Sequence, residues 1–428
     1  MPTGGWSRRQ PKSGEVVRRH RPDYKIALYT AILMLLGLVV MYALGPQRAH
    51  VMNAAMGSNY SDSYFFIKQV AHIVLAAGAF VFVAFVPVKI YYKLATPLLI
   101  AALAACTILL FAGWLDLPFA PEINGARSWF SLGALGSFQP SELLKLALVV
   151  YLGVFLGIRV KQGLINDFDK TILPLAVILG LVVFFVVLAQ RDLGTGMATL
   201  MMVAAMLFMA GLSKRWFAIF GAVVLVGGLV MTLAYPHRMS RLTTFLKGDE
   251  TSVSDDSTYH IENAKIAIGT GGLFGVGIGN SVQATGYLPE VINDSIFAVM
   301  GEVFGFVGLV ALIAIFVAML LRILRTAEFL VDYRLKLMAA GVFGWFGSHV
   351  ILNIAAIIGL MPLTGITLPL VSYGGTSMLF MAAALGLVFQ LSRYTIHPSH
   401  TKEIAKYENS SSRRRVGRAR HSSSRRSS

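Results

Sequence analysis

The sequence predicts an all-α integral membrane protein that crosses the bilayer about ten times. Of its 428 residues, 56% are hydrophobic and 14% are charged, and the mean hydropathy is +0.68. A water-soluble domain of this length is much less apolar. Cys106 is the single cysteine, which excludes a disulfide scaffold and a Cys/His zinc site. A spanning helix needs about 20 mostly apolar residues, and such runs occur at residues 26–44, 65–88, 94–111, 143–158, 172–189, 195–212, 216–235, 295–321, 337–360 and 371–391.

Basic residues set the expected orientation. The net charge of +16 is concentrated at the two ends, with seven Lys or Arg in residues 1–25 and ten in the Ser-rich residues 392–428. Short loops on the same side also hold more Lys and Arg than the longer opposite segments, which places this side in the cytoplasm. We therefore expect a basic cytoplasmic tail (1–25), a transmembrane domain (26–391) and a second basic cytoplasmic tail (392–428). Such tails attract anionic lipid, and nucleic acid is not an expected partner.

Two long segments fall on the outer side of the membrane in this arrangement. They are residues 112–142 and residues 236–294, the second of which joins the seventh and eighth helices. Both contain polar clusters that a simple connector does not need, whereas the inner loops are short. Any chemistry is therefore expected at the outer face or within the bilayer.

Ionisable residues at membrane depth are costly and invite a functional interpretation. Lys145 follows Glu142 by three residues on one predicted helix, and Asp192 occupies the turn between two others. An ion pair between Lys145 and Asp192 would neutralise both, either as a structural clamp or beneath a site. Glu302 lies two turns into the eighth helix, beside glycines that suit close helix packing.

Three further ionisable residues, Lys68, His72 and His349, fall within the predicted helices. We expect them to snorkel towards the interface or to bond a neighbouring helix, and we assign them no function.

An arginine and an aromatic residue mark the first outer segment, where Arg127 precedes Trp129. A planar guanidinium suits phosphate and a Trp ring suits a sugar face, although anchoring at the membrane interface explains the same residues.

Two glycine-rich stretches interrupt the apolar pattern. Residues 269–279 lack a closing Gly-Lys-Ser/Thr and follow no strand, so they form neither a Walker nor a Rossmann site, but their amides could approach a pyrophosphate. Residues 364–377, which include Ser372 and Gly374, precede the last helix. Irregular backbone at membrane depth is tolerated where it lines a cavity.

Two carboxylates, Glu290 and Asp294, close the second outer segment. Asp294 directly precedes the eighth helix, so both an N-cap and a general base at the outer surface are open to it. Asp255 and Asp256 could hold a divalent cation, although a Ser/Asp-rich stretch is more often a solvated loop.

In their order along the chain, these motifs resemble the SEDS family, which comprises the cell-division FtsW, rod-shape RodA and sporulation SpoVE proteins. The motifs are residues 124–130, 139–145 and 190–196, the 287–302 segment with Glu290, Asp294 and Glu302, and residues 364–377. The resemblance runs from about residue 25 to residue 395. Residues 365–369 favour FtsW, whereas residues 124–130 are closer to some rod-shape members.

The resemblance implies a ten-helix enzyme of the bacterial cytoplasmic membrane that polymerises lipid II into β-1,4-linked peptidoglycan strands. It implies that Asp294 matches the family's essential aspartate and acts as general base in one inverting transfer, and that Lys145 and Asp192 match its buried ion pair. Glu142 and Glu302 are expected to support the site. The substrate-binding candidates are Arg127, Lys145, Lys265, Glu290, Ser372 and Gly374.

The expected partners are a class B penicillin-binding protein, which is a transpeptidase, and other membrane proteins of the division or elongation machinery. No cofactor is certain, and Mg²⁺ or Mn²⁺ is the only candidate. Two other functions fit the sequence, namely a lipid II transporter and a non-catalytic scaffold for wall enzymes.

Overall fold

Each apolar run of the sequence forms a helix in the computed structural model, which describes residues 21–122, 125–131, 133, 136–233 and 256–395. Within these residues, nine helices are long and apolar enough to cross a membrane and Leu193–Met209 is a shorter tenth one, which confirms the predicted fold class. The spans are α1 (Tyr24–Met56), α2 (Tyr64–Phe85), α3 (Val88–Trp114), α4 (Pro140–Lys161), α5 (Leu173–Val183) with its flanking turns, α6 (Leu193–Met209), α7 (Lys214–Leu233), α10 (Ile296–Phe329), α11 (Tyr333–Ile357) and α12 (Gly375–Leu391).

The fifth span is a composite helix. Wider π-type turns, η2 (Phe168–Ile172) and η3 (Phe184–Ala189), flank α5. A π turn shifts the hydrogen-bond register by one residue and often occurs at functional sites. In η3 the Asp192 amide bonds back to the Val186 carbonyl at 3.0 Å, which sets the turn that delivers Asp192 to the start of α6.

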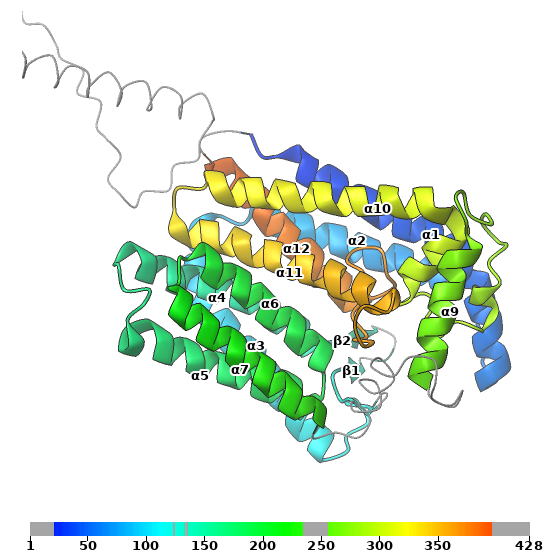
Figure 1. Cartoon of the computed structure of the whole chain (residues 1–428), viewed down its shortest axis with the longest axis horizontal. Helices are drawn as coiled ribbons and strands as arrows, with labels where there is room; N and C mark the ends of the chain where they lie inside the picture. Colours follow the sequence, from blue (N-terminus) through cyan, green and yellow to red (C-terminus); the bar gives the residue numbers. More distant parts are fainter. Residues whose placement is uncertain (1–20, 123–124, 132, 134–135, 234–255, 396–428) are drawn as a thin grey trace, which may run out of the picture.

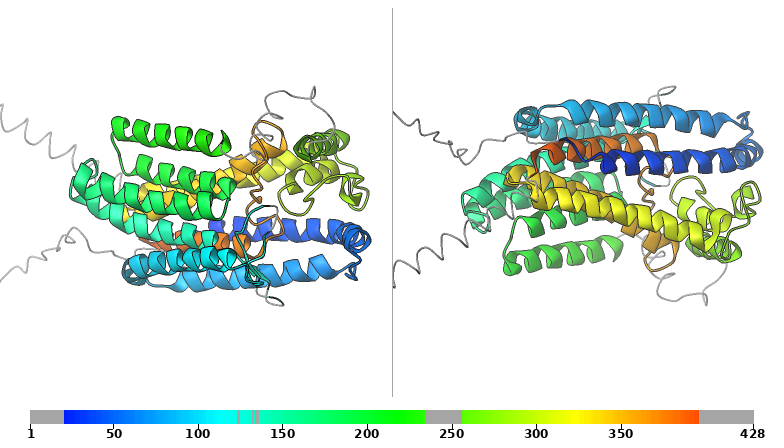
Figure 2. Two further views of the ribbon diagram at one scale, coloured as in Figure 1. Left: turned by 90° about the horizontal axis from the view of Figure 1, so that it is seen from below. Right: turned by 90° about the horizontal axis from the view of Figure 1, so that it is seen from above.

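Helix α11 forms the centre of the bundle. It packs against α4, α6 and α10, and α12 packs against α2. Gly341 and Gly344 of α11 face Val149 and Met202. A larger side chain at either glycine would collide with these neighbours, so the two glycines allow the helices to pack closely. Helix α7 lies at the opposite side of the bundle from α2 (Figure 2). None of its residues from Lys214 to Met231 is buried.

Both ends of the described chain lie at the same end of the bundle (Figure 1). The Asp23 amide donates to the Ser392 hydroxyl at 2.8 Å, and Arg322 reaches the Asp23 carboxylate at 3.5 Å. Leu330 pairs with Thr395 in an isolated bridge. The two predicted tails lie outside the described residues, but the chain enters and leaves the bundle on one side, as an even number of spans requires.

The opposite end of the bundle holds both long segments predicted to be outer. The first contains a two-stranded hairpin, β1 (Phe130–Ser131) and β2 (Ser137–Phe138). The second was expected to be a loop, and beyond residue 255 it instead contains helix α9 (Asp256–Thr270) and a 3₁₀ turn, η5 (Gln283–Thr285). Figure 1 shows α9 beside the outer end of α10.

A break in α10 holds the glycine-rich segment that follows α9. Gly305 has φ 68° and ψ −170°, which interrupts the helix. The amides of Val276 and Gly277 donate to the carbonyls of Glu302 and Val303 at 2.9 and 3.1 Å, and the Phe306 amide donates to the Gly272 carbonyl at 2.9 Å. The expectation that amides of this stretch approach a pyrophosphate is therefore wrong for Val276 and Gly277, because both are bonded to α10.

Replacing Gly305 with Ala tests this break. A Cβ atom there would lie 2.3 Å from the Gly275 nitrogen, in a backbone conformation that L residues avoid. We expect Gly305→Ala to lower the free energy of unfolding by about 2 kcal/mol or more, measured by thermal unfolding in nanodiscs. Gly180→Ala is the matched control, because its Cβ would meet nothing within 4 Å on a helix, and it should be neutral or slightly stabilising. Equal stability of the two variants would contradict the assignment.

Candidate functional site

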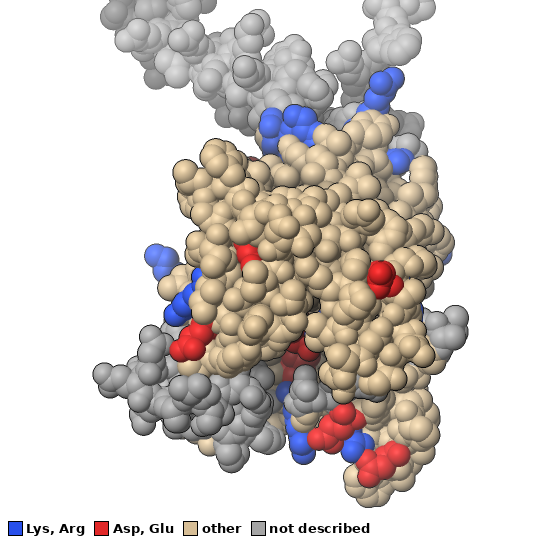
Figure 3. Space-filling view, turned by 90° about the vertical axis from the view of Figure 1, so that its right-hand side faces the viewer, with Lys and Arg blue, Asp and Glu red and all other residues tan. Residues whose placement is uncertain are grey.

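A polar cavity of about 790 Å³ opens at the outer end of the bundle. Figure 3 views this end, where acidic side chains lie around a recess in the lower half of the picture. The lining comes from the start of α2, the β1–β2 hairpin, the first turns of α4 and α6, the residues before α10, one residue of α11 and the break before α12. The ionisable lining residues are Lys68, His72, Glu142, Asp192, Glu290, Asp294, His349 and Tyr373.

Asp294 lies half-buried in the wall of this cavity. The N-cap of α10 is Ser295, so the interpretation of Asp294 as the helix cap is wrong. The Asp294 carbonyl accepts a hydrogen bond of 2.7 Å from the Asn353 amide of α11, which also donates to Ile366 at 2.7 Å. Asn353 therefore ties the backbone of Asp294 to the break before α12.

Ser372 strengthens the same connection. Its hydroxyl donates to the Asn293 carbonyl at 2.6 Å and accepts from the Leu368 amide at 2.9 Å. Ser372 is 3% exposed and does not line the cavity, so its hydroxyl positions the backbone, and its predicted contact with substrate stays a prediction. Gly374, by contrast, lines the cavity as expected.

Glu290 also lines the cavity and has a left-handed backbone with φ 48°. Its carboxylate accepts a hydrogen bond from the Asn293 amide. Tyr373 lies nearby in the lining, and burial, together with Tyr64 and Tyr60, raises the pKa of Tyr373 to about 12. Its hydroxyl consequently stays protonated at neutral pH.

Lys145 lies sealed beneath the cavity with 0% exposure. Its ammonium donates to Glu142 Oε1 at 2.7 Å, lies 2.9 Å from His349 Nε2 and sits 5.1 Å from the centre of the Trp345 ring. It does not line the cavity, and the predicted contact between Lys145 and substrate stays a prediction that the position of this side chain does not support.

The predicted ion pair between Lys145 and Asp192 is also replaced. Lys145 pairs with Glu142, one turn away on the same face of α4. Asp192 caps α6, because its carboxylate accepts from the Thr195 amide at 2.9 Å and from Gln139 at 3.3 Å. The negative charge of Asp192 is therefore stabilised by the amide of Thr195 at the start of α6, and not by Lys145 as predicted.

Arg127 lies in a separate polar pocket of about 310 Å³ that does not include Asp294. Its guanidinium bonds the carboxylates of Asp116 and Glu122, which raises the pKa of Arg127. Lys265 is exposed on α9 beside Gly359 and lies outside the polar cavity. Neither of these two predicted phosphate ligands borders the Asp294 cavity.

Glu302 is 1% exposed within α10. Its carboxylate accepts hydrogen bonds from the Ser281 hydroxyl at 2.5 Å, the Val282 amide at 2.9 Å and the Gln283 amide at 3.3 Å. The carboxylate therefore anchors the outer segment to the broken helix and supports the site from outside the cavity.

Three lining residues were assigned no function from the sequence, namely Lys68, His72 and His349. The expectation that such a residue bonds a neighbouring helix is confirmed for His349, whose Nε2 lies 2.9 Å from the Lys145 ammonium of α4. The available signal was their position within apolar runs, where an ionisable residue commonly marks a functional cavity. Of the metal candidates, Asp255 lies outside the described residues and the side chain of Asp256 is not described. Among the described residues, no three His, Cys, Asp or Glu side chains lie together as a metal site.

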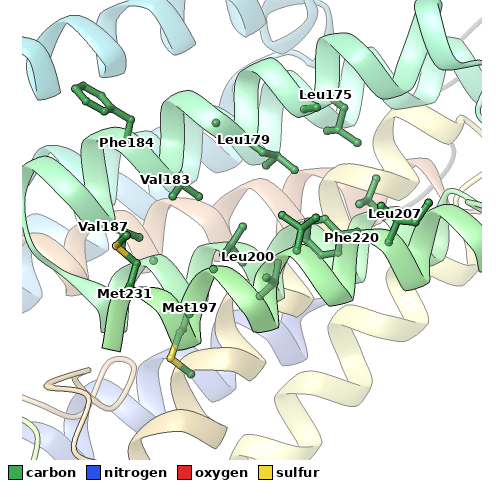
Figure 4. A pocket seen from close by; sticks show the side chains of 18 of the residues that line it. Leu175, Leu179, Val183, Phe184, Val187, Met197, Leu200, Leu207, Phe220 and Met231 are labelled. Atoms are coloured by element: carbon green, nitrogen blue, oxygen red, sulfur yellow. The ribbon is translucent and has the colours of Figure 1, made fainter. Parts of the chain in front are cut away.

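An apolar groove of about 550 Å³ runs between α5, α6 and α7. Figure 4 shows Leu179 and Val183 on one wall facing Leu200 and Phe220 on the other. The first turn of α6 contributes residues to both the groove and the polar cavity, and no described residue lines both. Asp192 and Thr195 line the cavity there, whereas Leu193, Gly196 and Met197 line the groove.

The fold and the two cavities define a polytopic membrane protein with a polar chamber at one end of the bundle and an apolar groove between α5, α6 and α7. The chain belongs to the family of cell cycle proteins that comprises FtsW, RodA and SpoVE, whose sequence pattern matches residues 24–397.

The family relationship extends over nearly the whole chain of its relatives. The chain is 33% identical to stage V sporulation protein E of Bacillus subtilis, over 88% of this chain and 99% of that protein. It is also 33% identical to the probable peptidoglycan glycosyltransferase FtsW of Nitrosomonas europaea, over 87% and 93%.

Solved structures also match this chain over most of its length. A chain of a peptidoglycan synthase complex that coordinates polymerization and crosslinking matches with a TM-score of 0.67 and 28% identity, over 87% of this chain and 98% of that one. The rod shape determining protein RodA of Thermus thermophilus matches with a TM-score of 0.62 and 28% identity, over 88% and 98%.

The buried ion pair can be tested by a double-mutant cycle. Lys145→Met leaves the Glu142 carboxylate buried without its cation and should lower the free energy of unfolding by about 3–5 kcal/mol. Adding Glu142→Leu removes the orphaned charge and should restore most of this loss. Thermal unfolding of the four proteins in nanodiscs measures the coupling, and additive effects would contradict the pairing.

Proposed function

We propose that this protein is a peptidoglycan glycosyltransferase of the bacterial cytoplasmic membrane, which polymerises lipid II with Asp294 as general base. The observation that carries the proposal is the position of Asp294 in a polar cavity, in a bundle whose helix α6 also borders an apolar groove. A substrate with a sugar headgroup, a diphosphate and a polyprenyl chain needs both environments. Several relatives of the chain are named peptidoglycan glycosyltransferases.

The reaction requires one proton acceptor and one displacement. Asp294 takes the proton from the 4-hydroxyl of the acceptor sugar as this oxygen attacks the anomeric carbon of the donor. The bond between that carbon and the diphosphate breaks, and the diphosphate leaves with the electron pair. Attack from the face opposite the leaving group converts the α linkage of the donor into a β-1,4 bond. One aspartate is sufficient because a single inverting step completes the transfer.

Stabilisation of the leaving diphosphate is assigned to Lys68, which takes the place of the three cations expected from the sequence. Lys68 lines the cavity, whereas Arg127, Lys145 and Lys265 do not. Preorganised positive charge beside the developing negative charge lowers the barrier to departure. The described carboxylates offer no preformed set of three metal ligands, and we derive no step through Mg²⁺ or Mn²⁺.

The groove suits the polyprenyl part of the substrate. Its wall consists of Leu, Ile, Val, Met, Phe, Ala, Gly and one Trp, and an apolar chain gains free energy by leaving water for such a surface. Helix α6 borders both spaces, with Asp192 in the lining of the cavity and Leu193 in the lining of the groove.

The proposal includes a partner and an orientation. A neighbouring structure comes from a peptidoglycan synthase complex that coordinates polymerization with crosslinking, which supports a class B penicillin-binding protein as partner. We place the end that holds Asp23 and Ser392 in the cytoplasm, so that the cavity faces the outer surface where glycan is assembled.

Transport of lipid II fits the structure less well than its polymerisation. A transporter commonly binds its substrate near the bilayer midplane, whereas the polar cavity lies at the outer end of the bundle (Figure 3). A scaffold requires no lined cavity at all. Membership of the division or elongation machinery stays open between FtsW-like and RodA-like roles.

Replacing Asp294 with Asn tests the function. The full chain, supplied with lipid II and its penicillin-binding protein, should make glycan polymer, and Asp294→Asn should slow polymerisation at least about a hundredfold because the amide cannot accept the proton. Glycan products are measured on gels, with and without divalent cation. Glu262→Gln, an exposed change on α9, is the control and should leave the rate unchanged. Normal polymer from Asp294→Asn would exclude Asp294 as the general base, whereas no polymer from the unchanged chain would exclude the enzyme and favour a transporter or scaffold.

A further inference from the structure

Glu142 lines the cavity and holds an unused hydrogen-bond acceptor. Its side chain is 3% exposed and lines the same cavity as Asp294. Oε1 is bonded to Lys145 at 2.7 Å, whereas Oε2 is buried and has no hydrogen-bond partner among the described residues. A buried carboxylate oxygen without a donor costs free energy, so a bound molecule that supplies an O–H or N–H group would be favoured there.

His349 is a second acceptor for the Lys145 ammonium, beside Glu142 Oε1. Trp345 donates its indole N–H to His349 Nε2 at 3.2 Å, and the Lys145 ammonium lies 2.9 Å from the same atom. Both groups can only donate. Nε2 must therefore carry a lone pair, which makes His349 a neutral imidazole with its proton on Nδ1.

The neutral imidazole fixes the direction of the Lys145 ammonium. One N–H points to Glu142 Oε1, a second points to His349, and the ammonium rests on the Trp345 ring. Without an acceptor at position 349, the ammonium would be drawn towards both oxygens of Glu142 and would occupy Oε2. His349 thereby keeps Oε2 available to the cavity.

The lining identifies the class of ligand group. Four carboxylates border the cavity, namely those of Glu142, Asp192, Glu290 and Asp294. A carboxylate oxygen accepts from sugar hydroxyls and from the N–H of an acetamido group, whereas the diphosphate, which has no such donor, is assigned to Lys68 in the same cavity. The acceptor oxygen therefore suits the sugar part of a lipid-linked substrate and does not suit its diphosphate.

We propose that Glu142 Oε2 is a sugar-binding group that accepts an O–H or acetamido N–H of the substrate, and that His349 is the positioning residue that keeps this oxygen unoccupied. The inference rests on the proposed function, because it assigns part of the substrate to the cavity. It adds a second carboxylate with a role distinct from that of the base, since Glu142 binds and Asp294 removes the proton.

The test compares two lipids that differ only in the sugar. The full chain carrying Asp294→Asn, which blocks turnover, is placed in nanodiscs and titrated with lipid II or with undecaprenyl diphosphate. Adding Glu142→Gln preserves an oxygen for Lys145 but presents an NH₂ group to the cavity. We expect binding of lipid II to weaken about tenfold or more, and binding of undecaprenyl diphosphate to stay unchanged.

Two variants at position 349 test the positioning role. His349→Gln supplies a neutral acceptor to Lys145 and Trp345 and should retain binding of lipid II. His349→Leu removes the acceptor and should weaken binding of lipid II as Glu142→Gln does, again without affecting undecaprenyl diphosphate. Ser348→Ala is the matched control, because it removes a buried hydroxyl from the neighbouring position of α11 that bonds only backbone carbonyls. It should leave both affinities unchanged.

The outcomes separate this inference from the proposed function. Equal weakening of both lipids by Glu142→Gln, or an unchanged affinity for lipid II, overturns the sugar-binding role. Loss of binding in His349→Gln as well as in His349→Leu overturns the positioning role. If the parent protein binds neither lipid, the proposed function fails, and the inference that depends on it fails for that separate reason. Thermal unfolding of each variant shows that the compared proteins are folded.

Discussion

The need to bond every backbone amide and carbonyl inside the bilayer shapes this structure more than any other constraint. Most of the chain meets it with continuous helices. At Gly305 the helix is interrupted, and the segment after α9 replaces the lost bonds through Val276 and Gly277. Before α12, Ser372 and Asn353 bond the carbonyls of Asn293, Asp294 and Ile366. Of the two irregular stretches, the one before α12 borders the cavity, and the bonds of Asn353 and Ser372 there fix the position of Asp294.

Hydropathy predicted the spans well because membrane helices must be apolar over a fixed length, whatever their neighbours. Every predicted run became a helix, although α3 extends to Trp114 and α1 extends to Met56. Helix α9 was missed because it is short and polar, so its pattern did not differ from that of a loop. The π turn η3, which ends just before Gln190, was not predicted, because a local sequence pattern does not distinguish a π turn from an α-helix.

The site was predicted less completely than the fold, and the reason is geometric. Of the predicted site residues, Asp294, Glu290, Glu142 and Gly374 line the cavity. The partner of Lys145 was assigned from charge and from the family resemblance, neither of which distinguished Asp192 from Glu142 in this chain. Charge also suggested Arg127 as a phosphate ligand, but Asp116 and Glu122 surround it in a different pocket. Sequence spacing identifies which groups are costly to bury, whereas contacts across helices decide which of them meet.

The bond between Asp23 and Ser392 has a consequence for how the protein attaches to its surroundings. It makes two strongly cationic segments, one before residue 23 and one after residue 395, leave the bundle from a single point. A leaflet rich in phosphatidylglycerol or cardiolipin beside this point would meet both segments at once. Attachment of the first segment would raise the effective concentration of the second at the same headgroups, so the pair would behave as a bivalent anchor whose hold exceeds that of either part.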